Sequence, residues 1–270
     1  MLDLPLIAVD VGNARSKLGL FRALPAEGLP QPQQTWHLAN HEPLGGQTTA
    51  LAAALAEFGG RPLAWWIGSV NRPAASRLID WIRRQRPDDA IVLLAAGDVP
   101  LQVRLERPDM VGVDRLLDAV AANRLRDPRR PAVVIDVGTA ITVDLVAADG
   151  AFCGGAILPG IAMSARALHE FTDLLPLSEM SELQSPPPPL GTDTAAAMRA
   201  GLFWGAVGAI RELANKLAAN EERGPGPISS PQIFLTGGAS VAVAELLGAD
   251  AQHVPHLTLA GIALAAARVG

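Results

Sequence analysis

The stretch VVIDVGTAITVDLVAADG, residues 133–150, decides how the rest of the chain is interpreted. It begins with an apolar run that ends in Asp-Val-Gly, and an earlier stretch, IAVDVGNARSKLGLF at residues 7–21, begins in the same way. In both, a second segment of strand-forming residues follows the glycine. Two such runs joined by a short turn are typical of a β-hairpin. The sequence therefore predicts two hairpins, each with an aspartate, Asp10 or Asp136, at the end of its first strand.

The two hairpins align without a gap over residues 7–18 and 133–144. Four identical positions result: Asp10 with Asp136, Val11 with Val137, Gly12 with Gly138, and Ala14 with Ala140. Asp-Val-Gly is also common in turns, because Asp bonds to the local backbone and Gly adopts positive φ. The placement of the copies favours a duplication, since each begins one half of the chain and precedes a similar series of strands and helices. Duplicated halves predict two domains with a cleft between them, and ligands often bind at such an interface.

Short apolar runs alternate with longer Ala/Leu-rich segments along the chain, which predicts an α/β fold with mixed, mainly parallel sheets flanked by helices. The expected strands are Leu6–Val9, Leu63–Ile67, Ala90–Leu94, Ala132–Ile135, Ile141–Val146 and Ile233–Leu235. The expected helices are Gly46–Phe58, Ala74–Arg84, Asp114–Leu125, Thr194–Asn220 and Ala242–Leu247. The segment DPRRP, Asp127–Pro131, marks a joint between an N-terminal domain, residues 1–128, and a C-terminal domain, residues 129–270.

Composition narrows the class of protein. With 49% hydrophobic and 18% charged residues, the chain of 270 residues can bury a substantial core. A net charge of −5 argues against a nucleic-acid binder, which needs an excess of Lys and Arg on one face. The single cysteine excludes an intrachain disulfide. The N-terminus lacks the basic start of a signal peptide and no apolar run reaches the roughly 18 residues that span a bilayer, so we expect a cytoplasmic protein without membrane contact.

The two predicted turns have chemistry that suits phosphate binding. A glycine turn exposes backbone N–H groups to an anion, and small residues permit close approach. Further donors come from side chains in the hairpins: Asn13, Ser16, Thr139 and Thr142. Lys17 adds a cation that can reach a terminal phosphate. Asp10 and Asp136 would then hold a cation, because carboxylates otherwise repel a polyphosphate. The chain has no GxxxxGK[ST] sequence, which excludes a P-loop enzyme.

Three motifs occur in order along the chain. The first, D-x-G-N-[TS]-x-x-K, corresponds to Asp10–Lys17, and the second, G-x-D-R, corresponds to Gly112–Arg115. The third combines D-x-G-T-A-x-T-x-D at Asp136–Asp144 with GG-x-I-x-P-G at Gly154–Gly160. With the late FLTGGAS, residues 234–240, this order resembles the type III pantothenate kinases, also described as Bvg accessory factor proteins. They belong to the acetate-kinase/sugar-kinase/Hsp70/actin superfamily.

The resemblance spans nearly the whole chain and implies two duplicated actin-like (ribonuclease H-like) domains. It implies ATP-dependent phosphorylation of pantothenate to 4′-phosphopantothenate, the first step of coenzyme A biosynthesis, with Mg²⁺ accompanying ATP. ATP-binding residues would be Thr139 and the first motif: Asp10, Val11, Gly12, Asn13, Ala14, Arg15, Ser16 and Lys17. Substrate-binding residues would be Gly112, Val113, Asp114, Arg115 and Thr194.

Two residues receive more specific roles from the resemblance. Asp114 would be the base that takes the proton from the primary hydroxyl of the substrate. Asp136 would bind a monovalent cation, K⁺ or NH₄⁺. From the residues alone, the preferred explanation of Asp114 is a helix cap, with Arg115 on the surface. Thr194 likewise sits at a helix start, where Asp193 or Thr192 could serve as the cap.

The chain departs from the family pattern at two positions. Ala14 stands where Thr or Ser is usual, which removes a hydroxyl from the phosphate turn. Leu105 stands where Tyr often lines the substrate pocket. Two alternatives to pantothenate phosphorylation therefore stay open: a kinase for another small hydroxy acid, and a non-catalytic regulator on the same scaffold. The resemblance and the apolar segment Thr194–Leu217 also predict a homodimer.

Overall fold

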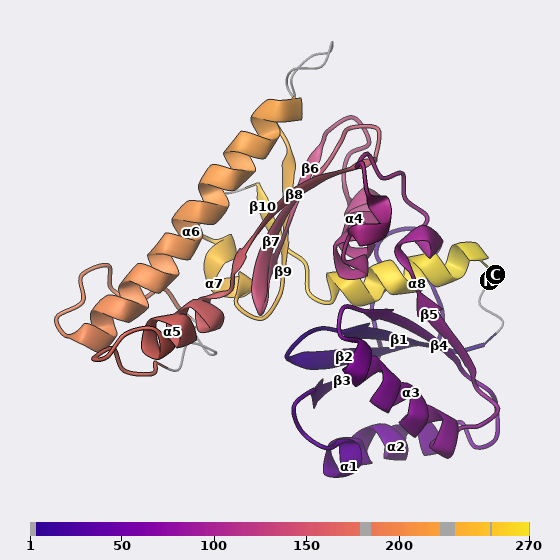
Figure 1. Cartoon of the computed structure of the whole chain (residues 1–270). Helices are drawn as coiled ribbons and strands as arrows, with labels where there is room; N and C mark the ends of the chain where they lie inside the picture. Colours follow the sequence, from indigo (N-terminus) through magenta and orange to yellow (C-terminus); the bar gives the residue numbers. More distant parts are fainter. Residues whose placement is uncertain (1–3, 179–184, 222–229, 249, 270) are drawn as a thin grey trace. The chain divides into compact units, whose positions relative to one another are not determined.

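The computed structural model describes residues 4–178, 185–221, 230–248 and 250–269 (Figure 1). The chain divides into two compact units: unit 1, residues 1–125 with 256–270, and unit 2, residues 126–255. Each unit contains one five-stranded sheet with helices on it. The predicted duplicated α/β fold is thus confirmed. Unit 1 also includes the last residues of the chain, which a division after residue 128 assigns to the C-terminal half.

The sheet of unit 1 has the strand order β3-β2-β1-β4-β5. Its strands are β1 (Leu6–Val11), β2 (Arg15–Phe21), β3 (Gln34–Ala39), β4 (Ala64–Ser69) and β5 (Ala90–Leu94). The hairpin and β3 pair in antiparallel fashion, whereas β1, β4 and β5 run parallel. Consequently β1, β3 and β4 all end at the same edge of the sheet, where polar residues follow them.

Helices cover both faces of this sheet (Figure 1). On one face lie α1 (Leu44–Gln47), α2 (Thr49–Ala56) and α3 (Arg72–Gln85), and on the other α4 (Val113–Leu125) and α8 (Leu257–Val269). Two short 3₁₀ turns, η1 (Ala96–Asp98) and η2 (Pro108–Met110), precede α4. Ile7 and Val9 of β1 share a core cluster with Leu78 of α3, whereas Leu6 and Ala8 are buried on the opposite face. The continuous apolar run of β1 is explained by this double coverage.

In unit 1, α4 and α8 cross at unusually close range. A Cβ placed on Gly261 of α8 would lie 2.0 Å from the carbonyl oxygen of Leu117 in α4. A Cβ on Gly68 of β4 would lie 2.8 Å from Leu117 Cδ1. Glycine at these two positions therefore lets α4 approach both α8 and the sheet. Because Gly68 pairs with Asp10 and lies close to Val113, the start of α4 is near the end of β1.

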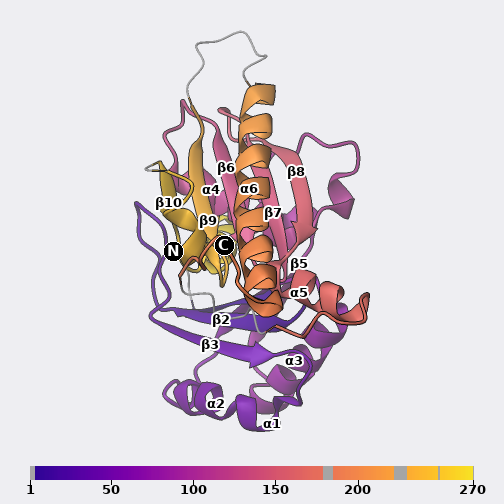
Figure 2. The same cartoon turned by 90° about the vertical axis from the view of Figure 1, so that its left-hand side faces the viewer.

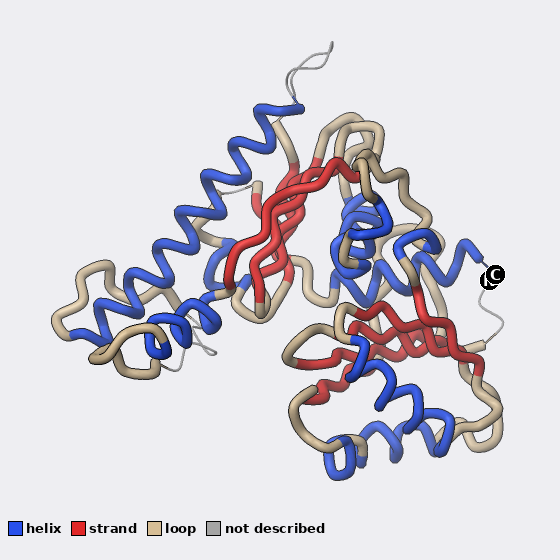
Figure 3. The backbone as a smooth tube through the Cα atoms, in the orientation of Figure 1, coloured by secondary structure: helices blue, strands red, loops and turns tan. Residues whose placement is uncertain are grey.

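Unit 2 repeats the order of unit 1, with β8-β7-β6-β9-β10 in place of β3-β2-β1-β4-β5. Figure 3 shows the strands of both sheets in red and the helices in blue. Its strands are β6 (Ala132–Val137), β7 (Ala140–Val146), β8 (Phe152–Pro159), β9 (Gln232–Thr236) and β10 (Ala251–His253). Its helices are α5 (Ile161–Glu170), α6 (Thr194–Glu221) and α7 (Ser240–Ala244). The long α6 runs along one face of the sheet (Figure 2), where Phe203 and Val207 join a core cluster with Ile135.

The two hairpins differ by one residue in their turns. Asp10 lies opposite Lys17 in the first, whereas Asp136 lies opposite Thr142 in the second. The gapless alignment, which matches Lys17 with Val143, is therefore wrong beyond the turn. Because side chains alternate between the two faces of a sheet, a one-residue slip moves each side chain to the opposite face. Lys17 and Thr142 are the equivalent residues, and both lie beside the aspartate.

Some elements differ from those expected. The predicted helix Gly46–Phe58 is interrupted at Thr48, the residue between α1 and α2. The strands β3, β8 and β10 and the helices α5 and α8 were not expected. Within the described part of the chain, no helix combines the length and the apolar character that a membrane crossing requires.

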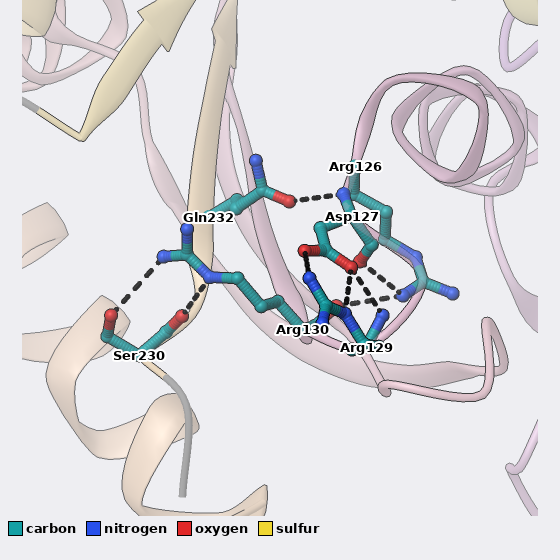
Figure 4. Close-up of polar contacts among 6 residues, drawn as sticks. All are labelled: Arg126, Asp127, Arg129, Arg130, Ser230 and Gln232. Atoms are coloured by element: carbon teal, nitrogen blue, oxygen red, sulfur yellow. Dashed lines mark hydrogen bonds and ion pairs between the residues drawn. The ribbon is translucent and has the colours of Figure 1, made fainter.

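The predicted joint is an ordered part of unit 2 (Figure 4). The backbone N–H of Asp127 donates to Gln232 Oε1 at 2.6 Å, and Arg130 Nε donates to the Ser230 carbonyl at 2.9 Å. Arg129 donates to the Asp127 carboxylate through its side chain and its backbone, which lowers the pKa of Asp127 to about 2. These contacts tie the residues before β6 to the residues that begin β9.

Candidate functional site

The first hairpin places opposite charges at the end of β1. Asp10 lies between Lys17 of β2 and Gly68 of β4 in the register of the sheet, and Lys17 Nζ is 3.9 Å from Asp10 Oδ2. Both side chains lie on the face that α4 and α8 cover, and both are partly exposed. Val11, the next residue, is buried on the other face and so serves the core. Asp10 and Lys17 therefore form a paired, solvent-accessible anion and cation.

The turn after β1 is held by two asparagines that the sequence analysis missed. Asn40 Nδ2 donates to the Gly12 carbonyl at 2.7 Å, and Asn40 Oδ1 accepts from Ser16 Oγ at 2.7 Å. Asn71 Nδ2 donates to the Asn13 carbonyl at 3.2 Å. The Ser16 hydroxyl is thus occupied in holding the turn, on the face opposite Lys17. The signal that could have identified them is an asparagine within two residues of the end of each strand at this edge, Asn40 after β3 and Asn71 after β4.

The remaining residues of the first motif are at the surface. Asn13, Ala14 and Arg15 are all exposed, and the Gly12 N–H donates to the Arg15 carbonyl at 3.1 Å. The turn therefore presents an accessible backbone with a cationic side chain at its end.

Asp114 is the second residue of α4, so it is not the N-cap residue of that helix. Its Oδ1 accepts from the backbone N–H of the adjacent Arg115 at 2.8 Å, and a Cβ on Gly112 would lie 2.6 Å from the same oxygen. Burial raises the pKa of Asp114 above its ordinary value, opposed by the Arg115 hydrogen bond and by the charges of Arg115 and Lys17. Val113 is buried in the core, and Arg115 is half-buried. A mostly buried carboxylate with a raised pKa, near a lysine, has the properties of a general base.

The second hairpin carries hydroxyls where the first carries a lysine. Asp136 lies between Thr142 of β7 and Thr236 of β9. Gly237 has φ +99, and a Cβ there would lie 2.3 Å from Asp136 Oδ1. Only glycine permits so close an approach of the backbone to this carboxylate. Thr139 is exposed in the turn itself.

Thr194 begins α6, and the cap of that helix is Asp193, whose Oδ1 accepts from Ala196 N at 2.7 Å. The Thr194 hydroxyl is therefore not needed for capping. Thr194 lines a pocket of ≈ 430 Å³ in unit 2, together with apolar residues that include Leu168 and Met198. A hydroxyl that lines an otherwise apolar pocket suits a small ligand that has both polar and apolar groups.

Comparison with known proteins identifies the family to which the chain belongs. The family model described as type III pantothenate kinase matches residues 6–216. A type III pantothenate kinase of Gluconobacter oxydans is 30% identical over 273 residues, covering 97% of this chain and 93% of that protein. Another, from Paramagnetospirillum magneticum, is 41% identical over 165 residues, which is 61% of this chain and 59% of that protein.

The fold comparison agrees with the duplicated architecture. The crystal structure of MreB5 of Spiroplasma citri bound to ADP superposes with a TM-score of 0.53 at 8% identity, covering 99% of this chain and 97% of that one. At this identity the similarity concerns the fold alone, which is actin-like. The family match covers both hairpins and the Asp114 segment between them, so the chain belongs to the type III pantothenate kinase family.

Proposed function

We propose that the protein transfers the γ-phosphate of ATP to the primary hydroxyl of pantothenate, giving 4′-phosphopantothenate for coenzyme A biosynthesis in the cytoplasm. Family membership supports the reaction. The observation that carries the proposal is Asp114, a mostly buried carboxylate whose pKa is raised by burial and lowered in part by the charge of Lys17. A non-catalytic regulator with the same fold would not need a buried carboxylate at Asp114 close to the charge of Lys17.

Three charged groups of unit 1, Asp114, Lys17 and Asp10, have a defined task in this reaction. Asp114 accepts the hydroxyl proton as the oxygen attacks phosphorus, while Lys17 offsets the charge of the transferring phosphate. The turn held by Asn40 and Asn71 offers backbone N–H groups to the phosphate chain. When bound, Mg²⁺ would neutralise phosphate oxygens, and Asp10 is placed to hold it through water.

The substrate would be bound by residues from two segments. Gly112, Val113 and Arg115 surround Asp114 in sequence, and Arg115 offers a cation for the pantothenate carboxylate or the transferring phosphate. Thr194, at its apolar pocket, offers a hydroxyl beside surfaces suited to the dimethyl carbons of pantothenate. Thr139 would bind ATP from the second turn.

The surroundings of Asp136 fit a monovalent cation. Asp136 supplies a carboxylate, its neighbours Thr142 and Thr236 supply hydroxyl oxygens, and the Val137 carbonyl lies beside Gly237. One anionic and several neutral oxygens suit a large, weakly charged ion such as K⁺ or NH₄⁺ better than Mg²⁺, which keeps a rigid shell of waters.

We therefore expect K⁺ or NH₄⁺ to raise the phosphorylation rate well above the rate in Na⁺ at equal ionic strength. Asp136→Asn should weaken this dependence together with ATP binding, because the amide cannot supply the anionic ligand. The measurement is the initial rate of ADP release in matched chloride salts. Equal rates in K⁺ and Na⁺ would remove the role assigned to Asp136 and leave the kinase proposal standing.

A homodimer is the proposed oligomeric state, with the exposed face of α6 at its interface. Four small residues, Ala197, Gly201, Gly205 and Gly208, are exposed along this face, and Cβ atoms on the three glycines would meet open space. Phe171, which follows α5, is 84% exposed, so a large apolar side chain is also available for contact. Small residues let two helices approach closely.

Light scattering at micromolar concentration should give the mass of a dimer. Gly205→Lys should shift the mass toward that of the monomer, because it places a charge on the α6 face. Gly97→Lys in η1 is the matched control, since its Cβ also meets open space, and it should stay dimeric. A monomeric wild-type protein would contradict the proposal.

The second candidate function, a kinase for another small hydroxy acid, is favoured by Leu105 in place of the usual tyrosine. ADP release measured with a panel of small hydroxy acids separates the two. We expect kcat/KM for pantothenate to exceed the other values. A higher value for another acceptor would reassign the substrate, and no release with any acceptor would favour a non-catalytic regulator.

A further inference from the structure

A single row of neighbouring residues crosses the sheet of unit 1 at the level of Asp10. Asp10 pairs with Lys17, and Lys17 pairs in turn with His37 of β3. Directly opposed residues of antiparallel strands lie on the same face, with Cβ atoms about 4.5–5.5 Å apart. His37 is therefore the next side chain beyond Lys17 on the face that carries Asp10.

Three basic side chains, Lys17, Arg15 and His256, lie close enough to His37 to affect it electrostatically. Arg15 precedes Lys17 by two residues on β2 and so lies on the same face. His256, which precedes α8, is also close enough to affect His37 electrostatically. His37 is exposed to solvent, but the part of its ring that is covered lowers its pKa below the ordinary value, and the charges of Lys17, Arg15 and His256 lower it further. Asp10 is the one carboxylate in the row, and Lys17 stands between it and His37.

The equivalent row of unit 2 has a different character. There Asp136 pairs with Thr142, and Thr142 pairs with Ile157 of β8. Ile157, the counterpart of His37, is 62% exposed. The hairpin architecture therefore does not require a polar residue at this position, and a histidine beside Lys17 is a feature of unit 1 alone.

We propose that His37 binds the phosphate chain of the nucleotide beside Arg15 and Lys17, and that it takes up a proton from solvent when the polyphosphate binds. The inference rests on the proposed function in one respect, that the first hairpin holds ATP. In the ligand-free protein the neighbouring cations favour the neutral imidazole. A bound polyanion reverses the local potential, favours the imidazolium and accepts its hydrogen bond.

The sign of the pH dependence follows from this proton uptake. At a pH above the pKa of His37 in the complex, His37 is neutral both in the free protein and in the complex. In that range it adds no pH dependence to the affinity for the polyphosphate. Between the pKa of the complex and the lower pKa of the free protein, affinity rises as the pH falls, by up to about tenfold per pH unit. The other charged or titratable side chains close to His37 are Arg15, Lys17, His256 and, beyond Lys17, Asp10.

The test uses inorganic triphosphate as the probe, so it does not depend on turnover. The His37 ring resonance is assigned by its loss in His37→Gln and titrated by NMR with and without triphosphate. We expect the pKa to rise when triphosphate is present. Dissociation constants measured between pH 5.5 and 8 should fall more steeply with falling pH for the wild type than for His37→Gln, a comparison that cancels the ionisation of the ligand itself.

His41→Gln is the matched control, because His41 is an exposed histidine just beyond β3 that lies next to Glu42. It should retain the wild-type pH dependence. An unchanged His37 pKa, or the same pH dependence in His37→Gln as in the wild type, overturns the inference even if pantothenate is phosphorylated normally. A triphosphate-induced shift without any kinase activity would uphold it while the proposed function fails.

Discussion

Asp114→Asn is expected to fold like the wild type and to lose phosphoryl transfer by about 10²-fold or more, the usual cost of removing a positioned base. The amide oxygen can still accept the Arg115 N–H, and a neutral side chain suits a mostly buried position. The measurement is kcat from ADP release, with a thermal melt to check folding. In the wild type, activity should fall as acid protonates Asp114, at a pH above the ordinary range for aspartate because burial raises its pKa.

Asp109→Asn is the matched control for this experiment. Asp109 lies in η2, five positions earlier, and forms an exposed ion pair with Arg107 at 3.2 Å. It should keep the wild-type rate, since exposed pairs contribute little and it has no assigned part in the reaction. If Asp114→Asn also keeps the wild-type kcat, the carboxylate is structural and the mechanism is wrong.

Gly261→Ala is expected to destabilise unit 1 by about 2–3 kcal/mol, the upper part of the usual range for overpacking. The new methyl group would lie 2.0 Å from the Leu117 carbonyl oxygen, and backbone cannot rotate away as a side chain can. The helices α4 and α8 would have to separate, which exposes buried residues of both. The measurement is the midpoint and slope of urea unfolding.

Gly46→Ala in α1 controls for the general effect of alanine, because a Cβ at Gly46 meets nothing within 4 Å. Alanine is favoured over glycine in helices by about 1 kcal/mol, so this variant should be as stable as the wild type or slightly more stable. Equal stability of Gly261→Ala and the wild type would mean that α4 and α8 do not pack as described.

The sequence predicted those elements whose local pattern agrees with their final environment. β1 and β6 are continuous apolar runs because both of their faces are covered. β3, QTWHLA, alternates polar and apolar residues and escaped a search for continuous runs. β8 contains two glycines, and β10 has only three residues, so neither has a strong strand pattern. The helix α8 is apolar on nearly all sides, and such a helix has little periodicity to detect.

In the candidate site, too, residues within a local sequence motif were predicted, and residues that depend on strand pairing were not. Asp10, Lys17 and Asp114 were predicted as site residues because each belongs to a short motif. Asn40 and His37 were not predicted, because Asn40 reaches the turn and His37 lies beside Lys17 only through the pairing of β2 with β3, which no local pattern encodes. The gapless alignment also concealed the extra residue in the first turn, and the sheet register alone shows that Lys17 corresponds to Thr142.

The most direct test of the central claim is transfer of labelled phosphate. Purified protein is incubated with ATP labelled in the γ-phosphate, Mg²⁺, K⁺ and pantothenate, and the products are separated. We predict that the label appears in 4′-phosphopantothenate in proportion to the ADP formed, and that Asp114→Asn abolishes most of this transfer. Label that stays in ATP, or is released only as inorganic phosphate, would contradict the assignment of this protein as a pantothenate kinase.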